Sequence, residues 1–145
     1  MRSRKQIKGQ SLVEFALIFP FVFLLITGFL DVSRAVFAYA SISNAVREGT
    51  RYATVSKNDL NAAYTNPTNN PIIDKVISYS VGVELTKSQV AVVVQKDTSG
   101  FYTKISITAT HMFKPVTPGI KQIFGTNAGI PIKAQSTMRI AQGSR

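Results

Sequence analysis

Cysteine is absent from the 145-residue sequence, histidine occurs once, and seven acidic residues stand against seventeen lysines and arginines. Without cysteine the chain has no disulfide framework and no thiolate metal site. The acids are dispersed, with no paired spacing suited to acid–base catalysis, and there is no P-loop, nucleophile elbow or HExxH motif. For the lone histidine, His111, we expect a buried or edge position with a local hydrogen bond. We therefore expect no enzyme activity, no metal site and no cofactor.

The net charge of +10 does not indicate a nucleic-acid-binding protein. Such a protein would carry its cations as a patch, interleaved with aromatic side chains on one face. The remaining cations of this chain are scattered singly, and its one cluster lies in the first eight residues, with no acid among them: Arg2, Arg4, Lys5 and Lys8. That cluster is a short basic tag, so we expect no nucleic-acid partner.

The tag precedes a long apolar run, in which residues 15–30 carry no charge. As a helix, residues 10–30 would extend about 31 Å at ~1.5 Å per residue, close to the bilayer core of about 30 Å. Lysine and arginine stay on the cytoplasmic side of a membrane. We expect a single-pass protein of the bacterial cytoplasmic (inner) membrane, with its N-terminus in the cytoplasm and its C-terminal domain outside.

Two other interpretations of this region are a cleaved signal peptide and a plain signal anchor. A signal peptidase would cut after Ala38-Tyr39-Ala40, which leaves a product beginning at Ser41. That site lies ten residues beyond Leu30, too far from the apolar core. The plain anchor would need no further processing, and the residues at the start of the span argue against it.

Gly9 stands at the junction between the basic tag and the apolar run, and Glu14 and Phe15 follow it. Glycine allows the extended, closely approached backbone that a protease at the membrane surface requires. A carboxylate inside a membrane costs up to about 2–3.5 kcal/mol and usually has a partner. Cleavage after Gly9 would create an α-amino group on Gln10, which could neutralise Glu14 of a neighbouring subunit. The simpler alternative is that Glu14 lies at the headgroup level and Gly9 only begins the helix.

Gly9 followed by Glu14-Phe15 resembles the pattern that prepilin peptidases recognise in type IV pilins and pseudopilins. The wider run, residues 9–55, resembles the TadE-like proteins of tight-adherence (Tad/Flp) pilus systems. Ser33, where glycine is more common, departs from that pattern. The features that carry the resemblance are Glu14-Phe15-Ala16-Leu17, Pro20, Gly28, Arg34 and the segment Ala45-Val46-Arg47-Glu48-Gly49-Thr50-Arg51-Tyr52-Ala53.

The resemblance implies a minor pilin or pseudopilin that is cut between Gly9 and Gln10 and acts in assembly of a Tad/Flp pilus. The implied partners are a prepilin peptidase, other pilins or pseudopilins (TadF-like or Flp-type subunits) and the Tad inner-membrane machinery. A role in adhesion and incorporation into a surface pilus are further expectations. A major Flp pilin would be shorter and would lack a β domain of this size. The alternative function is a permanently anchored extracytoplasmic binding module that is never polymerised.

Beyond the apolar run, residues 32–56 show the spacing of an amphipathic helix. We expect the membrane helix to continue to about residue 55, with a kink at Pro20 because proline lacks the N–H that the helix needs. The predicted apolar face contains Val32, Val36 or Ala35, Tyr39, Ile42, Val46, Gly49 and Ala53. On this helix Arg47, Glu48, Gly49 and Arg51 have two interpretations: a contact with a partner helix that approaches closely at Gly49, or a solvated turn with local Arg–Glu pairing.

The rest of the chain predicts an α+β fold of pilin type, with an antiparallel sheet of about three strands and short helices. We expect a loop over 57–70, a short helix over 71–80 and strands over 89–96, 101–113 and 130–140. We also expect a hairpin connection over 97–100 and a short helical turn that begins at Thr117 and ends at Gly125. The predicted domains are a leader over 1–9, a transmembrane helix over 10–31, a stalk helix over 32–56 and an extracytoplasmic domain over 57–145.

Overall fold

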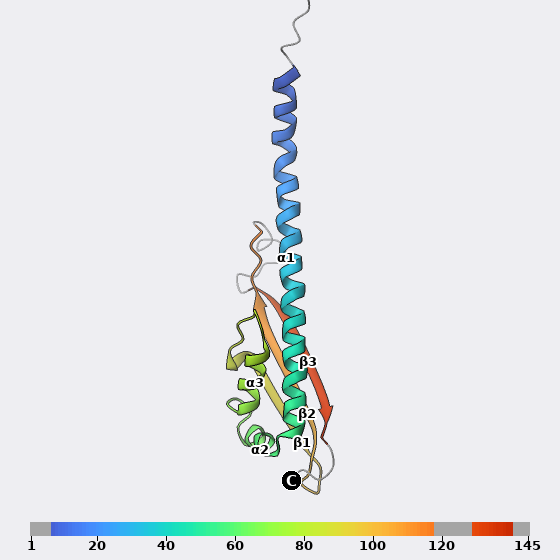
Figure 1. Ribbon diagram of the computed structural model, residues 1–145, viewed down its shortest axis with the longest axis vertical. Coiled ribbons are helices and arrows are strands. Elements are labelled where there is room, and N and C mark those ends of the chain that lie inside the picture. The colour runs from blue at the N-terminus through green and yellow to red at the C-terminus, as the bar shows by residue number, and fades with distance from the viewer. Residues whose placement is uncertain (1–6, 118–128, 141–145) are drawn as a thin grey trace, which may run out of the picture.

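A computed structural model describes residues 7–117 and 129–140. One long helix, α1 (Ile7–Val55), extends from a small domain that packs around its C-terminal half (Figure 1). The expected α+β fold is confirmed. The remaining elements are α2 (Lys57–Thr65), α3 (Pro71–Tyr79), a 3₁₀ turn η1 (Lys87–Gln89), β1 (Val90–Lys96), β2 (Tyr102–Phe113) and β3 (Ile130–Arg139).

The N-terminal half of α1 stands clear of the domain. Its large apolar side chains from Leu12 to Ile26 are all exposed, and the helix is long and apolar enough to cross a membrane. This geometry fits a single-pass membrane protein. The helix continues through Pro20 without interruption, and Figure 1 shows no sharp bend in this view, so the expected kink is not seen.

The three strands form one antiparallel sheet in the order β1-β2-β3. Val92 lies opposite Ile107 on β2, and Ala109 lies opposite Ala134 on β3. These residues are buried, whereas alternate positions on each strand point to the other face. The alternation that predicted three strands with one apolar face is therefore confirmed.

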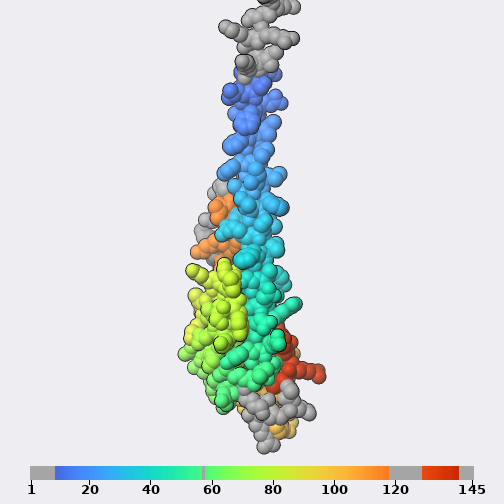
Figure 2. All heavy atoms as spheres, viewed as in Figure 1, coloured from blue at the N-terminus to red at the C-terminus, as the bar shows by residue number. Residues whose placement is uncertain are grey.

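All three helices cover that apolar face, because α1 packs against β2 and β3 while α2 and α3 pack against β1. Figure 2 shows the domain closely packed along the lower part of α1. The side chains that are fully buried there include Ile42, Val46, Leu60, Ile72, Ile73, Val76, Ile105 and Ile107. Burial of such side chains stabilises the fold by about 1.5–3 kcal/mol each, relative to leaving them exposed.

Two connections form as the sequence predicts. The Asn70 side chain caps α3 by accepting a hydrogen bond from the Ile73 N–H at 3.1 Å, and Pro71 occupies the first turn. In the hairpin between β1 and β2, the Asp97 carboxylate accepts hydrogen bonds from the backbone N–H groups of Ser99 and Phe101. Gly100 has a φ of 84°, which glycine adopts without strain.

The predicted loop over 57–70 is wrong in its first part, because residues 57–65 form α2. The Asn and Thr content suggested a loop, but Leu60 and Ala63 lie on one helical face and are buried against the core. Tertiary packing of these two side chains outweighs the weak helix propensity of their neighbours. The helical turn that was expected from Thr117 to Gly125 lies almost entirely outside the described residues.

The predicted apolar face of the stalk is right at its C-terminal end and wrong at its start. Ile42, Val46, Gly49 and Ala53 are buried against the domain, but Val32, Val36 and Tyr39 are exposed. Residues at seven-position intervals drift by about 20° per heptad on a straight helix. Near the membrane end the domain instead covers Asp31 and Ala38.

Candidate assembly site on the long helix

The residues of the predicted processing site lie on the free end of α1. Gly9 and Gln10 are both helical and exposed, and no atom lies within 4 Å of a Cβ built on Gly9. The Phe15 ring packs against the Phe19 ring at a centroid distance of 5.7 Å. Among the described residues, no tertiary contact at Gly9 would have to be broken before a peptidase could extend the backbone.

Glu14 is exposed on this apolar part of the helix. It has no hydrogen bond or ion pair with any residue of the described chain. The first cation after it, Arg34, is twenty positions away, which is about 30 Å along the helix axis. A carboxylate in an apolar layer without a partner of its own chain is the type of group that associates with a cation of another molecule.

At the C-terminal end of the apolar run, Asp31 forms hydrogen bonds with a segment that is distant in the sequence, residues 116–117. Its Oδ2 accepts hydrogen bonds from the Val116 N–H at 2.9 Å, the Thr117 N–H at 2.7 Å and the Thr117 hydroxyl at 2.7 Å. Its Oδ1 forms an ion pair with Arg34 at 3.1 Å. Asp31 and Thr117 are both buried, so the carboxylate fixes the segment after β2 to the helix.

The segment 45–53, which carries most of the family resemblance, divides between the interior and the surface. Gly49 and Thr50 face the domain, whereas Arg47, Glu48 and Arg51 are exposed. A Cβ at Gly49 would overlap Cγ2 of Val76. The close approach that glycine permits here is therefore between α1 and α3 of the same chain, and the three charged side chains are what this segment presents to solvent.

Tyr52 joins the end of α1 to α2. Its hydroxyl donates a hydrogen bond of 2.6 Å to Asp59 Oδ2, which also accepts one of 2.7 Å from the Ser56 hydroxyl. These two bonds hold the pKa of Asp59 below its ordinary value of 3.8. The bond to Asp59 conversely raises the pKa of Tyr52. Tyr52 and Asp59 thus stabilise the turn between two helices.

An apolar stripe continues along α1 beyond Asp31. Val32, Val36 and Tyr39 are spaced by four and three positions, so they lie on one side of the helix, and they are 61%, 62% and 53% exposed. Within residues 7–117 and 129–140, the domain leaves this side of the helix exposed. This arrangement could accept the apolar face of another helix.

His111 lies on the inner face of β2 opposite Ile132. Its Nδ1 is buried and makes no hydrogen bond, so the local hydrogen bond that we expected is not present at this atom. In the part of the chain that the structure describes, no three histidine, aspartate or glutamate residues are placed to hold a metal ion.

Residues 9–51 match the family model described as TadE-like protein. This segment is TadE-like. The match confirms the resemblance drawn from Glu14-Phe15 and from the segment 45–53, and it begins at Gly9. The TadE-like family is pilus-associated and structural rather than enzymatic. The match ends within α1, so the sheet and the shorter helices lie outside it, and no curated protein and no solved structure matches the chain.

The roles of Gly9, Gln10, Glu14 and Phe15 stay predictions from the sequence. Sequence reasoning missed the role of Asp31, which it placed only at the edge of the span. The partner of Asp31 is 86 positions away in the sequence, so no local pattern points to it. The one available signal was that an acid immediately follows the apolar run in a chain with few acids. It also missed the Tyr52–Asp59 bond, since the segment around Asp59 was expected to be a loop.

Proposed function

We propose that the chain is a minor pilin or pseudopilin, cut by a prepilin peptidase between Gly9 and Gln10 and acting in assembly of a Tad-type pilus. In this proposal the N-terminus faces the cytoplasm and the domain lies outside the cytoplasmic membrane. Glu14 is the observation that carries the proposal, because it is exposed in an apolar layer with no partner in the described chain. The α-amino group of Gln10 from a neighbouring subunit would supply the missing cation.

The exposed stripe of Val32, Val36 and Tyr39 supports the same proposal. It extends the apolar surface of the span past Asp31, so α1 presents one continuous apolar surface that is exposed in the described part of the chain. Lateral packing of this kind would bury the stripe and bring Glu14 close to a neighbouring N-terminus in one movement. Further along the helix, polar contacts with the neighbour would come from Arg47, Glu48 and Arg51. The opposite side of α1 packs against the domain there.

The processing step is tested by the intact mass of the protein after membrane extraction, with and without a co-expressed prepilin peptidase. We expect a product that begins at Gln10 only when the peptidase is present, and no product from a Gly9→Val variant. A matched Gly28→Ala variant should be cut normally. An unchanged Met1 start with the peptidase present would contradict the proposal, and a start at Ser41 would identify a signal peptide instead.

The assembly step is tested by cross-linking. Because the chain has no cysteine of its own, a single cysteine at position 12 or 36 reports contacts with pilin partners that carry their own introduced cysteine. We expect Glu14→Gln to leave cleavage and insertion intact and to reduce the cross-linked fraction severalfold, in line with the loss of about 1–2 kcal/mol from a polar contact within a membrane. A Gln10→Asn variant, which keeps the α-amino group, serves as the matched control.

The alternative function is a permanently anchored binding module that never polymerises. It predicts an intact N-terminus and no cross-link at either position, in cells that produce the whole pilus machinery. Equal cross-linking by the native protein and by Glu14→Gln would contradict only the charge pairing. It would leave the apolar stripe as the contact between subunits.

A further inference from the structure

The second face of the sheet is not covered by any described residue. All three helices pack on the inner face, and the strand register places the alternate side chains together on the outer one. Two hydrogen bonds confirm this grouping, from Gln135 Nε2 and from the Thr137 hydroxyl to the Ser106 hydroxyl. The described outer-face side chains are mainly hydroxyls, amides and three cations, Lys104, Lys133 and Arg139, with neither an acid nor an aromatic among them.

One row across this face concentrates positive charge. Gln95 lies opposite Lys104, and Lys104 lies opposite Arg139. Adjacent strands are about 4.8 Å apart, so the two cationic side chains leave the sheet from neighbouring positions. Like charges directly opposite each other destabilise a sheet. Neither cation has an ion pair or hydrogen bond in the described chain, so this row costs the fold stability without a compensating contact.

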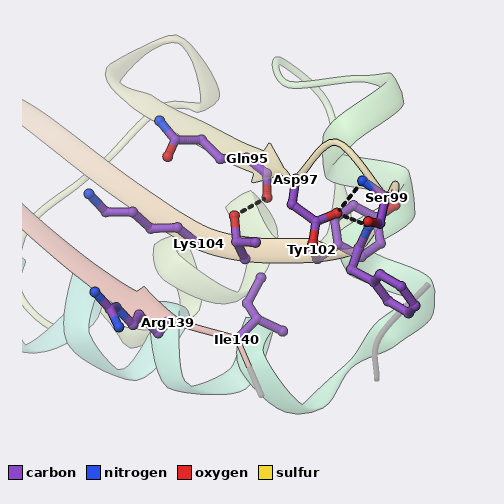
Figure 3. Close-up of a pocket in the computed structure, with 9 residues that line it drawn as sticks. Gln95, Asp97, Ser99, Tyr102, Lys104, Arg139 and Ile140 are labelled. Atoms are coloured by element: carbon purple, nitrogen blue, oxygen red, sulfur yellow. Dashed lines mark hydrogen bonds between the residues drawn. The ribbon is translucent and has the colours of Figure 1, made fainter. Parts of the chain in front are cut away.

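The row lines an open hollow of about 970 Å³ beside the β1–β2 hairpin. Figure 3 shows the side chains of Gln95, Lys104 and Arg139 extending from three neighbouring strands toward the same side. Asp97 also lines the hollow, but its Oδ1 accepts the hydrogen bonds of its own turn from Ser99 and Phe101. The hairpin lies at the opposite end of the molecule from the start of α1 (Figure 1).

We propose that this row binds an acidic polysaccharide, with Lys104 and Arg139 contacting carboxylates of successive sugar units and Gln95 contacting a hydroxyl. Charge-assisted hydrogen bonds of this kind are about twice as strong as neutral ones. The hydroxyl and amide side chains that continue along β2 and β3 supply further hydrogen bonds to a polyhydroxylated chain. This inference is independent of the pilin proposal, because it concerns the end of the domain that lies far from the span.

The composition of the face favours a polysaccharide over a protein. The cores of protein interfaces are enriched in aromatic residues and depleted of lysine, whereas this face has two lysines and no aromatic side chain among its described positions. Self-association through this face is disfavoured because its described positions hold three cations and no acid. Two aromatic residues line the hollow, but Tyr102 is buried and Phe101 is half-buried. A single-stranded nucleic acid would therefore not find there the row of exposed rings on which successive bases stack.

The test is binding of full-length protein in detergent micelles to alginate oligomers, measured by calorimetry. Neutral dextran of the same length and poly-L-glutamate are the comparison ligands. The variant is Lys104→Gln with Arg139→Gln. The matched control is Lys75→Gln with Lys87→Gln, which removes the same charge from the helical side of the domain, where Lys87 pairs with Asp74 and Lys75 lies over the Tyr52 ring.

We expect alginate to bind and dextran not to bind. Removal of Lys104 and Arg139 should weaken alginate binding by roughly tenfold or more, because hydrogen bonds to charged groups contribute about 1.5–3 kcal/mol each and 1.4 kcal/mol is a tenfold change. The control variant should bind almost as the native protein does. Equal weakening by both variants would show that net charge alone attracts alginate, which would overturn the proposal. Absence of alginate binding would overturn it as well. Tighter binding of poly-L-glutamate than of alginate would also overturn it, in favour of an acidic protein.

Discussion

Asp31 and Thr117 are 86 positions apart in the sequence, and yet two groups of Thr117 donate to the same oxygen of Asp31. The backbone N–H and the hydroxyl each lie 2.7 Å from Oδ2. The contact is buried and stands where α1 leaves its apolar run. It therefore fixes the segment after β2 to the membrane end of the domain, where the hydrophobic core no longer reaches.

Replacement of Asp31 by alanine should destabilise the domain. The change leaves the buried N–H and hydroxyl of Thr117 without an acceptor, and each such loss costs about 1–3 kcal/mol. We expect a lower free energy of unfolding and faster hydrogen exchange at the Thr117 amide, measured by mass spectrometry on the protein in micelles. Asp74→Ala is the control, because the exposed pair between Asp74 and Lys87 contributes only about 0–1 kcal/mol. Unchanged exchange at Thr117 would show that the loop is held by other contacts.

Much of the fold follows from local pattern. Three features depend on residues within a few positions of one another, so their signals are present in the sequence. They are the end of α1 at Val55, the Asn70 cap of α3 and the hairpin at Asp97–Gly100. The side of the stalk that is buried could not be derived in the same way. Val32 and Val46 satisfy the same helical pattern, and only the position of the sheet decides that one is exposed and the other buried.

Gly49→Ala should destabilise the protein because α1 and α3 are too close for a Cβ at this position. The added atom would overlap Val76 Cγ2 and lie 3.7 Å from Ile107. Overpacking of this kind costs about 1–3 kcal/mol. Combination with Val76→Ala makes room for the new atom, so the double variant should be more stable than the sum of the single effects predicts. Thermal unfolding of the three variants measures this coupling, and strict additivity would show that Gly49 does not contact α3.

The Tyr52–Asp59 pair should make stability depend on pH at the acidic end. The pKa of Asp59 is lowered in the folded protein, so its stabilising effect is fully present above the ordinary carboxyl value of 3.8. This stabilisation is lost as the pH falls through the pKa that Asp59 has in the folded protein, because the carboxylate then takes up a proton. Urea unfolding between pH 2 and 6 (roughly the range in which carboxyl groups titrate) should show a shallower slope for Asp59→Asn than for the native protein. Identical slopes would show that this carboxylate is equally acidic in the unfolded chain.

Reversal of one charge in the outer row should stabilise the sheet. Lys104→Glu places a carboxylate directly opposite Arg139 and replaces a repulsive pair with an attractive one. Such cross-strand pairs contribute about 0.2–1 kcal/mol each. We expect a higher midpoint of thermal unfolding at low salt and a smaller gain at high salt, since salt screens exposed charges. Lys133→Glu, which faces Thr110 rather than a cation, is the control and should have little effect.

The candidate sites differ in how far the sequence reveals them. Glu14 is visible from the sequence alone because a charge within an apolar run violates a one-dimensional pattern. The row of Gln95, Lys104 and Arg139 is not visible, since these residues come from three strands and meet only through the register of the sheet. Long-range pairing of this kind has no signature in a single sequence.

The unbroken course of α1 has a mechanical consequence. Its 49 residues extend about 74 Å at ~1.5 Å per residue, and the core and the Asp31 contact hold the domain rigidly along one end. In the membrane-spanning arrangement proposed above, the helix acts as a lever. A tilt of about 20°, common for membrane helices, about the N-terminal end of α1 would carry its far end sideways by about 25 Å. Whatever sets the angle of the span thus also sets the direction in which the outer face of the sheet points.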